Sequence, residues 1–73
     1  KKLKKSERLK LYECLRLFEL NMYNRVLNNH PLKGKYKGCY SINITGNLRA
    51  VYEFVAEDTV YFVDIDTHPN LYS

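Results

Sequence analysis

The chain's 73 residues make one domain, residues 1–73, near the lower size limit for a single hydrophobic core, and 45% hydrophobic and 14% aromatic residues are typical of a globular protein. No apolar run approaches the length of a membrane span and no signal peptide is recognisable, which excludes a membrane protein, so we expect a cytoplasmic one. The formal charge of +4 is concentrated early, with six of the twelve basic residues in residues 1–10, which indicates either a polyanion bound on one side or a solvated lysine-rich surface.

The first predicted element is an amphipathic helix from Ser6 to about Leu20. Ser6 can cap it, and Glu7 lies in the first turn, where the helix dipole favours an acid. Apolar residues at positions i, i+4 and i+7 form a core-facing stripe: Leu11, Leu15 and Phe18. Because the chain begins without methionine in a charged helical pattern, we expect that a preceding part has been cut off.

A polar, asparagine-rich stretch from residue 21 to residue 29 predicts a fraying helix end and a loop. Pro31 then prevents a helix and biases His30 towards an extended conformation. Three antiparallel strands follow, predicted at Tyr36–Ile44, Leu48–Val55 and Val60–Ile65. The expected fold is α+β, with a helix or helical hairpin packed on one face of a three-stranded meander that has one bare edge.

The register of the first hairpin follows from the two-residue period of side chains along a strand. A three-residue loop at residues 45–47 pairs Ile44 with Leu48 and gathers the apolar side chains on one face. Asn43 then lies opposite Arg49 on the other face, which we expect the helix to leave open. A two-residue loop would pair Ile44 with Arg49 and mix the two faces.

Two histidines are the side chains that titrate nearest neutrality. His30 lies in a loop with lysines, and His68 follows Asp64 and Asp66, which can orient an imidazole. Tyr72 lies four residues beyond His68 and can stack or donate a hydrogen bond. A lone histidine is usually structural or merely exposed. Here the neighbouring lysines and aspartates favour a catalytic role for the two histidines.

Other site types fit the sequence less well. Asp64, Asp66 and His68 alternate, but a tetrahedral metal site needs more nitrogen or sulfur ligands, so we expect no metal and no cofactor. Cys14 and Cys39 are far apart and are expected to be reduced, half-buried thiols, one in a helix and one in a strand.

Basic and aromatic residues interleave just before the first hairpin: Lys33, Lys35, Lys37, Tyr36 and Tyr40. This composition is typical of a surface that binds single-stranded nucleic acid. It also fits an edge strand protected by lysines.

Three motifs resemble the RelE/ParE superfamily of bacterial type II toxins, most closely its RelE/YafQ-like mRNA interferases. They are HPLKGKYKG from His30, GNLRAVY from Gly46 and THPNLY from Thr67. The resemblance covers residues 1–72 and implies a domain with helices on one face of a four-stranded antiparallel sheet. It also implies that the family's N-terminal strand is missing here.

The resemblance implies residue roles as well. His68 and then His30 are the candidates for acid–base catalysis, Tyr72 takes the position of an aromatic residue near the scissile phosphate, and Arg49 that of a phosphate-holding arginine. Asn43 stands where relatives carry histidine or lysine, and Asn47 where many carry aspartate. Asparagine cannot exchange a proton near neutrality, so these departures imply impaired activity, and loss of one acid or base costs roughly 10²–10⁴ in rate.

The function implied by the resemblance is that of a toxin that cuts mRNA on the ribosome without a metal and is neutralised by a cognate antitoxin. One alternative is a ParE-like inhibitor of DNA gyrase, which the paired histidines disfavour. Another is a catalytically weakened toxin that only binds its antitoxin, which Asn43 and Asn47 favour.

Overall fold

The computed structural model describes residues 2–72, with Tyr72 described by its backbone alone, and its first element is helix α1, Lys5–Leu20. The helix begins one residue before the predicted start because the Glu7 carboxylate accepts the backbone N–H of Lys4 at 2.9 Å. The prediction that Ser6 caps α1 is therefore wrong, and Ser6 lies inside the first turn. At the other end, the Asn21 N–H donates to the carbonyl of Leu17 at 2.8 Å.

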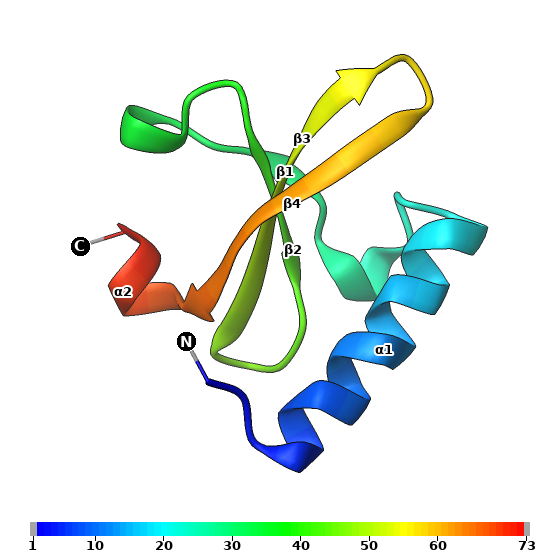
Figure 1. Ribbon diagram of the computed structural model, residues 1–73, viewed down its shortest axis with the longest axis vertical. Coiled ribbons are helices and arrows are strands. Elements are labelled where there is room, and N and C mark those ends of the chain that lie inside the picture. Colours follow the sequence, from blue (N-terminus) through cyan, green and yellow to red (C-terminus); the bar gives the residue numbers. More distant parts are fainter. Residues whose placement is uncertain (1, 73) are drawn as a thin grey trace.

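The elements after α1 are short until the sheet begins. They are η1 (Arg25–Leu27), β1 (His30–Pro31), η2 (Gly34–Tyr36), β2 (Tyr40–Asn43), β3 (Leu48–Ala56), β4 (Thr59–Thr67) and α2 (His68–Tyr72). The strands form one antiparallel sheet in the order β1-β2-β3-β4. The α+β class is confirmed, and Figure 1 shows α1 on one side of the sheet and η2 and α2 on the other.

Two details of the predicted strands are wrong. The sheet has four strands rather than three, because the dipeptide at His30 pairs with β2. The strand predicted from Tyr36 begins only at Tyr40, since Gly34 (φ 67°) and Gly38 (φ 93°) turn the backbone through the left-handed region that glycine tolerates. Cys39 consequently lies just before β2 and not within it.

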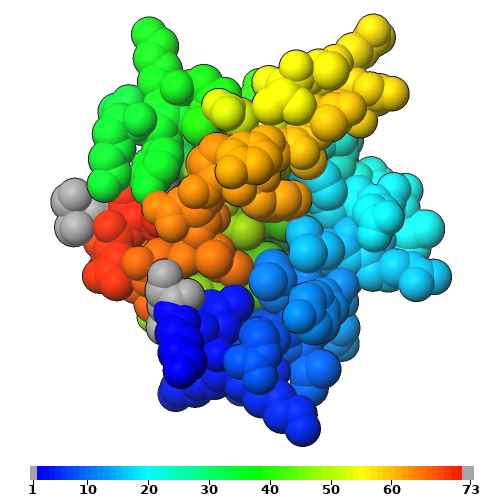
Figure 2. All heavy atoms as spheres, in the orientation of Figure 1, coloured from blue at the N-terminus to red at the C-terminus, as the bar shows by residue number. Residues whose placement is uncertain are grey.

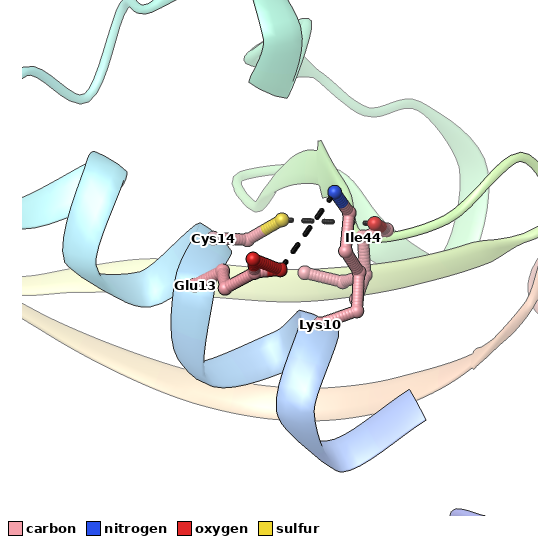
Figure 3. A network of polar contacts seen from close by, with 4 residues as sticks. All are labelled: Lys10, Glu13, Cys14 and Ile44. Atoms are coloured by element: carbon pink, nitrogen blue, oxygen red, sulfur yellow. Dashed lines mark hydrogen bonds and ion pairs between the residues drawn. The ribbon is translucent and has the colours of Figure 1, made fainter. Parts of the chain in front are cut away.

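The main core lies between α1 and the sheet. Its fully buried members are Cys14, Leu27, Ile42, Ile44, Leu48, Ala50 and Tyr52. The ring of Phe18 meets that of Tyr52 edge-on at 5.0 Å, a favourable geometry for aromatic pairs. Figure 3 shows the Cys14 thiol donating to the carbonyl of Ile44 at 3.6 Å, next to the ion pair of Lys10 with Glu13.

The predicted register of the first hairpin is confirmed. Ile42 is paired with Ala50 and Asn43 with Arg49, so the turn between β2 and β3 has the expected length. The Ile44 N–H donates to the carbonyl of Leu48 at 2.9 Å and closes it. Alternation placed the apolar side chains beneath α1, as a two-residue period requires.

The second face of the sheet, the one turned away from α1, is covered, contrary to the expectation that it lies open. Ser41 and Val51 are 0% exposed although neither belongs to the core beneath α1. Leu71 of α2 is buried as well, and α2 follows directly from β4. The last helix and the η2 loop therefore form a thin second layer, visible opposite α1 in Figure 1.

An apolar hollow of about 390 Å³ opens between α1 and β4, at the outer edge of the described sheet. Its lining residues are Leu11, Leu15, Ala50, Phe62, Val63, Asp64 and Ile65. Figure 2 shows this hollow between the blue atoms of α1 and the orange atoms of β4. Within residues 2–72, no helix is long and apolar enough to cross a membrane.

Candidate functional site

The polar residues of the second face form two rows that run across the strands. Residues paired across antiparallel strands project their side chains to the same face. The register therefore places together one row of His30, Ser41, Val51 and Asp64, and beside it a row of Asn43, Arg49 and Asp66. All six polar or charged residues of these rows lie on strands, where the sheet holds the backbone: His30, Ser41, Asn43, Arg49, Asp64 and Asp66.

Arg49 is anchored to the turn that precedes it. Its Nη1 donates to the carbonyls of Thr45 (2.9 Å) and Leu48 (3.1 Å), and its Nη2 donates to the carbonyl of Gly46 (3.3 Å). The guanidinium is therefore held at the end of the β2–β3 hairpin and does not lie beneath α1. A fixed cation at this position can hold a phosphate with the remaining N–H donors of the guanidinium.

His68 reaches the same turn from the other end of the chain. Its backbone N–H donates to the carbonyl of Asn47 at 2.8 Å, and its side chain is exposed. This bond ties the start of α2 to the Arg49 turn. Tyr72 ends α2, and its side chain lies outside the described part of the structure.

His30 approaches the second face from the opposite edge of the sheet. Its Nδ1 lies 2.7 Å from the carbonyl of Asn28, which suits a protonated Nδ1 and leaves Nε2 to exchange protons. Strands are about 4.8 Å apart, so the backbones of β1 and β4 are on the order of 14 Å apart. The fold thus brings His68 beside the Arg49 turn, whereas His30 comes from the far side of the same face.

Two oxygen atoms on this face are buried without a hydrogen-bond partner among the described residues: Oγ of Ser41 and Oδ1 of Asn43. Buried polar atoms are normally paired, so each of these oxygens can accept a hydrogen bond from a bound group or water. Asn43 stands directly across from Arg49, so its amide can orient a group held by the guanidinium. It cannot supply a proton near neutrality.

The basic loop between β1 and β2 lies over the same side of the sheet. Lys33, Lys35 and Lys37 are exposed, whereas Tyr36 is half-buried and donates its hydroxyl to Oδ2 of Asp64 at 2.7 Å. The Lys35 Nζ lies 5.3 Å from the centre of the Tyr36 ring. Sequence reasoning missed this role of Asp64, because the partners are 28 residues apart and no local pattern links them.

The described residues contain no group of three or more His, Cys, Asp or Glu side chains arranged to hold a metal ion. The alternating Asp64, Asp66 and His68 do not converge, because Asp66 accepts the N–H of Thr67 (2.7 Å) and the amide of Asn70 (3.2 Å). The arrangement offers imidazoles, a fixed guanidinium and ammonium groups, which suit binding and acid–base chemistry on a phosphodiester.

Comparison with known proteins identifies a shared fold. The chain is similar to the crystal structure of YafQ from Escherichia coli strain BL21(DE3), with a TM-score of 0.74 and 20% identity over 90% of this chain and 74% of that one. It is similar to a histidine-to-glutamine mutant of E. coli YafQ as well, with a TM-score of 0.75 and 22% identity over the same shares. No family model matches the sequence, and no curated protein sequence matches it. The chain has the YafQ fold, in agreement with the fold that the RelE/YafQ-like resemblance predicts.

Proposed function

We propose that this chain is the toxin of a type II toxin–antitoxin system and cuts mRNA on the ribosome by metal-independent acid–base catalysis. The observation that carries the proposal is the meeting of Arg49, Asn43 and the start of α2 at one turn, on the face away from α1. The YafQ fold and the three sequence motifs support it.

The proposed reaction needs few groups. The ribose 2′-hydroxyl attacks the adjacent phosphate, so a base, an acid and a cation are required. His68 is exposed at the Arg49 turn and is assigned the acid–base role, with His30 as the second imidazole. Arg49 holds the phosphate, Asn43 orients it, and Tyr72 supplies an aromatic surface from the end of α2.

The lysine loop, residues 32–39, extends the proposed site along the RNA. Lys33, Lys35 and Lys37 are all exposed and would meet phosphates on either side of the scissile one, and Tyr36 adds an aromatic ring among them. The cognate antitoxin would neutralise this basic surface by charge complementarity. We assign the protein to the cytoplasm, where ribosomes and antitoxin are found, with no cofactor.

A catalytically weakened toxin is the second candidate, and Asn43, a half-buried residue whose Oδ1 is buried, favours it. The amide of Asn43 can hydrogen-bond a phosphate group but cannot transfer a proton to or from it. Asn47, the other departure from the family pattern, accepts the His68 N–H with its backbone carbonyl. Such a protein would keep the antitoxin partner and lose most of the cleavage rate.

The test is a translation reaction to which purified protein is added, with mRNA ends mapped afterwards. The proposed toxin cuts within codons being translated, and His68→Ala lowers the rate by roughly 10²–10⁴ without loss of fold, because the side chain is exposed. Intact mRNA with wild-type protein, together with tight antitoxin binding, would favour the weakened toxin. Inhibition of gyrase in a supercoiling assay would instead identify a ParE-like protein.

A further inference from the structure

One hydrogen bond joins the lysine loop, residues 32–39, to the far edge of the sheet. The hydroxyl of Tyr36 donates to Oδ2 of Asp64 at 2.7 Å, and both residues are half-buried. Tyr36 lies between β1 and β2, whereas Asp64 lies on β4 at the other end of the strand order. The bond to a carboxylate is of the stronger, charge-assisted kind.

A β-bulge places Asp64 on this face. Val51 is paired with Asp64 and Tyr52 with Phe62, so Val63 has no opposite residue. In an unbroken ladder continuing from the Phe62 pair, Asp64 would lie on the face that packs against α1. The extra residue reverses the alternation and turns the carboxylate towards the loop, which is a known use of bulges.

The carboxylate is itself held in place. Its Oδ1 accepts the backbone N–H of Ile65 at 2.8 Å, while Oδ2 accepts the Tyr36 hydroxyl. Both oxygens thus accept a hydrogen bond, which fixes the orientation of the carboxylate.

The loop needs such an anchor. At its base, the Leu32 N–H donates to the carbonyl of Cys39 at 2.9 Å, but its three lysines are exposed and it contains both glycines with positive φ. Glycine has the most backbone freedom of any residue, so holding a glycine-containing loop in one conformation costs more entropy. Two further backbone bonds shape the tip, from the Lys37 N–H to the carbonyl of Gly34 (3.0 Å) and from the Cys39 N–H to the carbonyl of Tyr36 (2.9 Å). These bonds are local to the loop, whereas the Tyr36 side chain ties the tip to β4.

We propose that Tyr36 and Asp64 form a latch that holds the lysine loop across the second face, so that both are positioning residues for a bound polyanion. The latch presents Lys33, Lys35 and Lys37 as one ordered row. The part of this inference that concerns RNA rests on the proposed function, whereas the latch itself does not.

The latch is tested by limited trypsin digestion, since trypsin cuts after the three lysines of the loop. Tyr36→Phe removes only the hydroxyl and should raise the cleavage rate in the loop roughly tenfold, because cleavage follows the population of the open loop. Asp64→Ala should do the same, and Asp64→Asn should have a smaller effect because its amide oxygen still accepts. Tyr61→Phe is the matched control, since Tyr61 is 60% exposed on the same strand as Asp64.

RNA binding is measured with the same variants on a short single-stranded RNA over a range of salt concentrations. Tyr36→Phe should weaken binding several-fold and flatten the salt dependence, because lysines of a mobile loop meet fewer phosphates at once. Unchanged trypsin rates in Tyr36→Phe would overturn the latch. Faster digestion with unchanged RNA affinity would overturn the positioning role. If the wild-type protein binds no RNA, the proposed function fails, and the trypsin rates still decide the latch.

Discussion

The backbone N–H of His68 lies 2.8 Å from the carbonyl oxygen of Asn47 and donates to it. This bond joins the first residue of α2 to the turn between β2 and β3, and Arg49 binds three carbonyls of the same turn region. A histidine near the end of the chain and an arginine from its middle are thereby held on one rigid hairpin end.

Arg49→Lys should impair both the turn and the proposed reaction. A lysine ammonium cannot reproduce the planar fork that serves three carbonyls, so we expect a loss of about 1 kcal/mol in the free energy of unfolding. Cleavage of mRNA should fall roughly 10- to 100-fold. Urea unfolding and the translation assay measure the two effects, with Arg16→Lys on the exposed side of α1 as control. Equal activity of Arg49→Lys and wild type would remove Arg49 from the site.

Asn43→His should increase the rate of cleavage. The substitution places a group that titrates near neutrality directly across from Arg49, where the amide cannot transfer a proton. We expect a gain of roughly tenfold or more in the translation assay. Asn43→Gln, which adds bulk but no titratable group, is the control. A gain in both variants would show that shape rather than proton transfer limits the rate.

Replacement of each lysine in the loop should reduce the salt dependence of RNA binding. If Lys33, Lys35 and Lys37 each meet one phosphate, every alanine substitution lowers the slope of log affinity against log salt by about 0.7. Lys10→Ala is the control, because Lys10 lies on α1 and is paired with Glu13 at 3.9 Å. Identical slopes in all four variants would exclude the loop from the binding surface.

Ser41→Ala should stabilise the protein or leave its stability unchanged. The Ser41 hydroxyl is buried and has no partner among the described residues, so its removal relieves a desolvation cost of about 1 kcal/mol. Thr45→Ala is the contrasting variant, because the Thr45 hydroxyl accepts the N–H of Leu48 at 3.0 Å. Urea unfolding should show that only Thr45→Ala is destabilised. Strong destabilisation of Ser41→Ala would mean that the hydroxyl is satisfied in solution.

Cys14 should be the less reactive of the two cysteines. Burial raises the pKa of its thiol above the ordinary value of 9.0, an effect that nearby Lys10 opposes and Glu13 reinforces. Little thiolate is therefore present at pH 8, and iodoacetamide should modify the more exposed Cys39 first. Mass spectrometry of peptides after timed labelling measures the order, and faster labelling of Cys14 would contradict its burial in the folded state.

The same pKa shift has a consequence for stability. Because the folded-state pKa lies above the unfolded value, the protonated thiol stabilises the fold below about pH 9, and this contribution is lost as the pH rises beyond it. Burial also raises the pKa of the Tyr52 hydroxyl above its ordinary value of 10.0, so the contribution of the protonated Tyr52 to stability is lost in the same way at higher pH. Cys14→Ala should therefore lose less stability than wild type between pH 8 and pH 10 in urea unfolding. An equal loss in the two proteins would assign the effect to Tyr52 or to other groups.

Side-chain periodicity, helical in residues 6–20 and alternating in the strands, was enough to derive the α+β class, the main helix and the register of the β2–β3 hairpin, including the pairing of Asn43 with Arg49. These features follow from local periods and from one apolar face, which the order of residues specifies directly. The short β1 escaped prediction because two residues carry no period.

The rest depended on contacts between distant parts of the chain. No local pattern pairs Tyr36 with Asp64, since a bulge at Val63 reverses the alternation before the acid is reached. The burial of Ser41 on the second face and the entry of His30 and His68 from opposite edges likewise follow from how loops and α2 fold back over the sheet. Such contacts form only when segments far apart in sequence meet, so periodicity along the chain cannot express them.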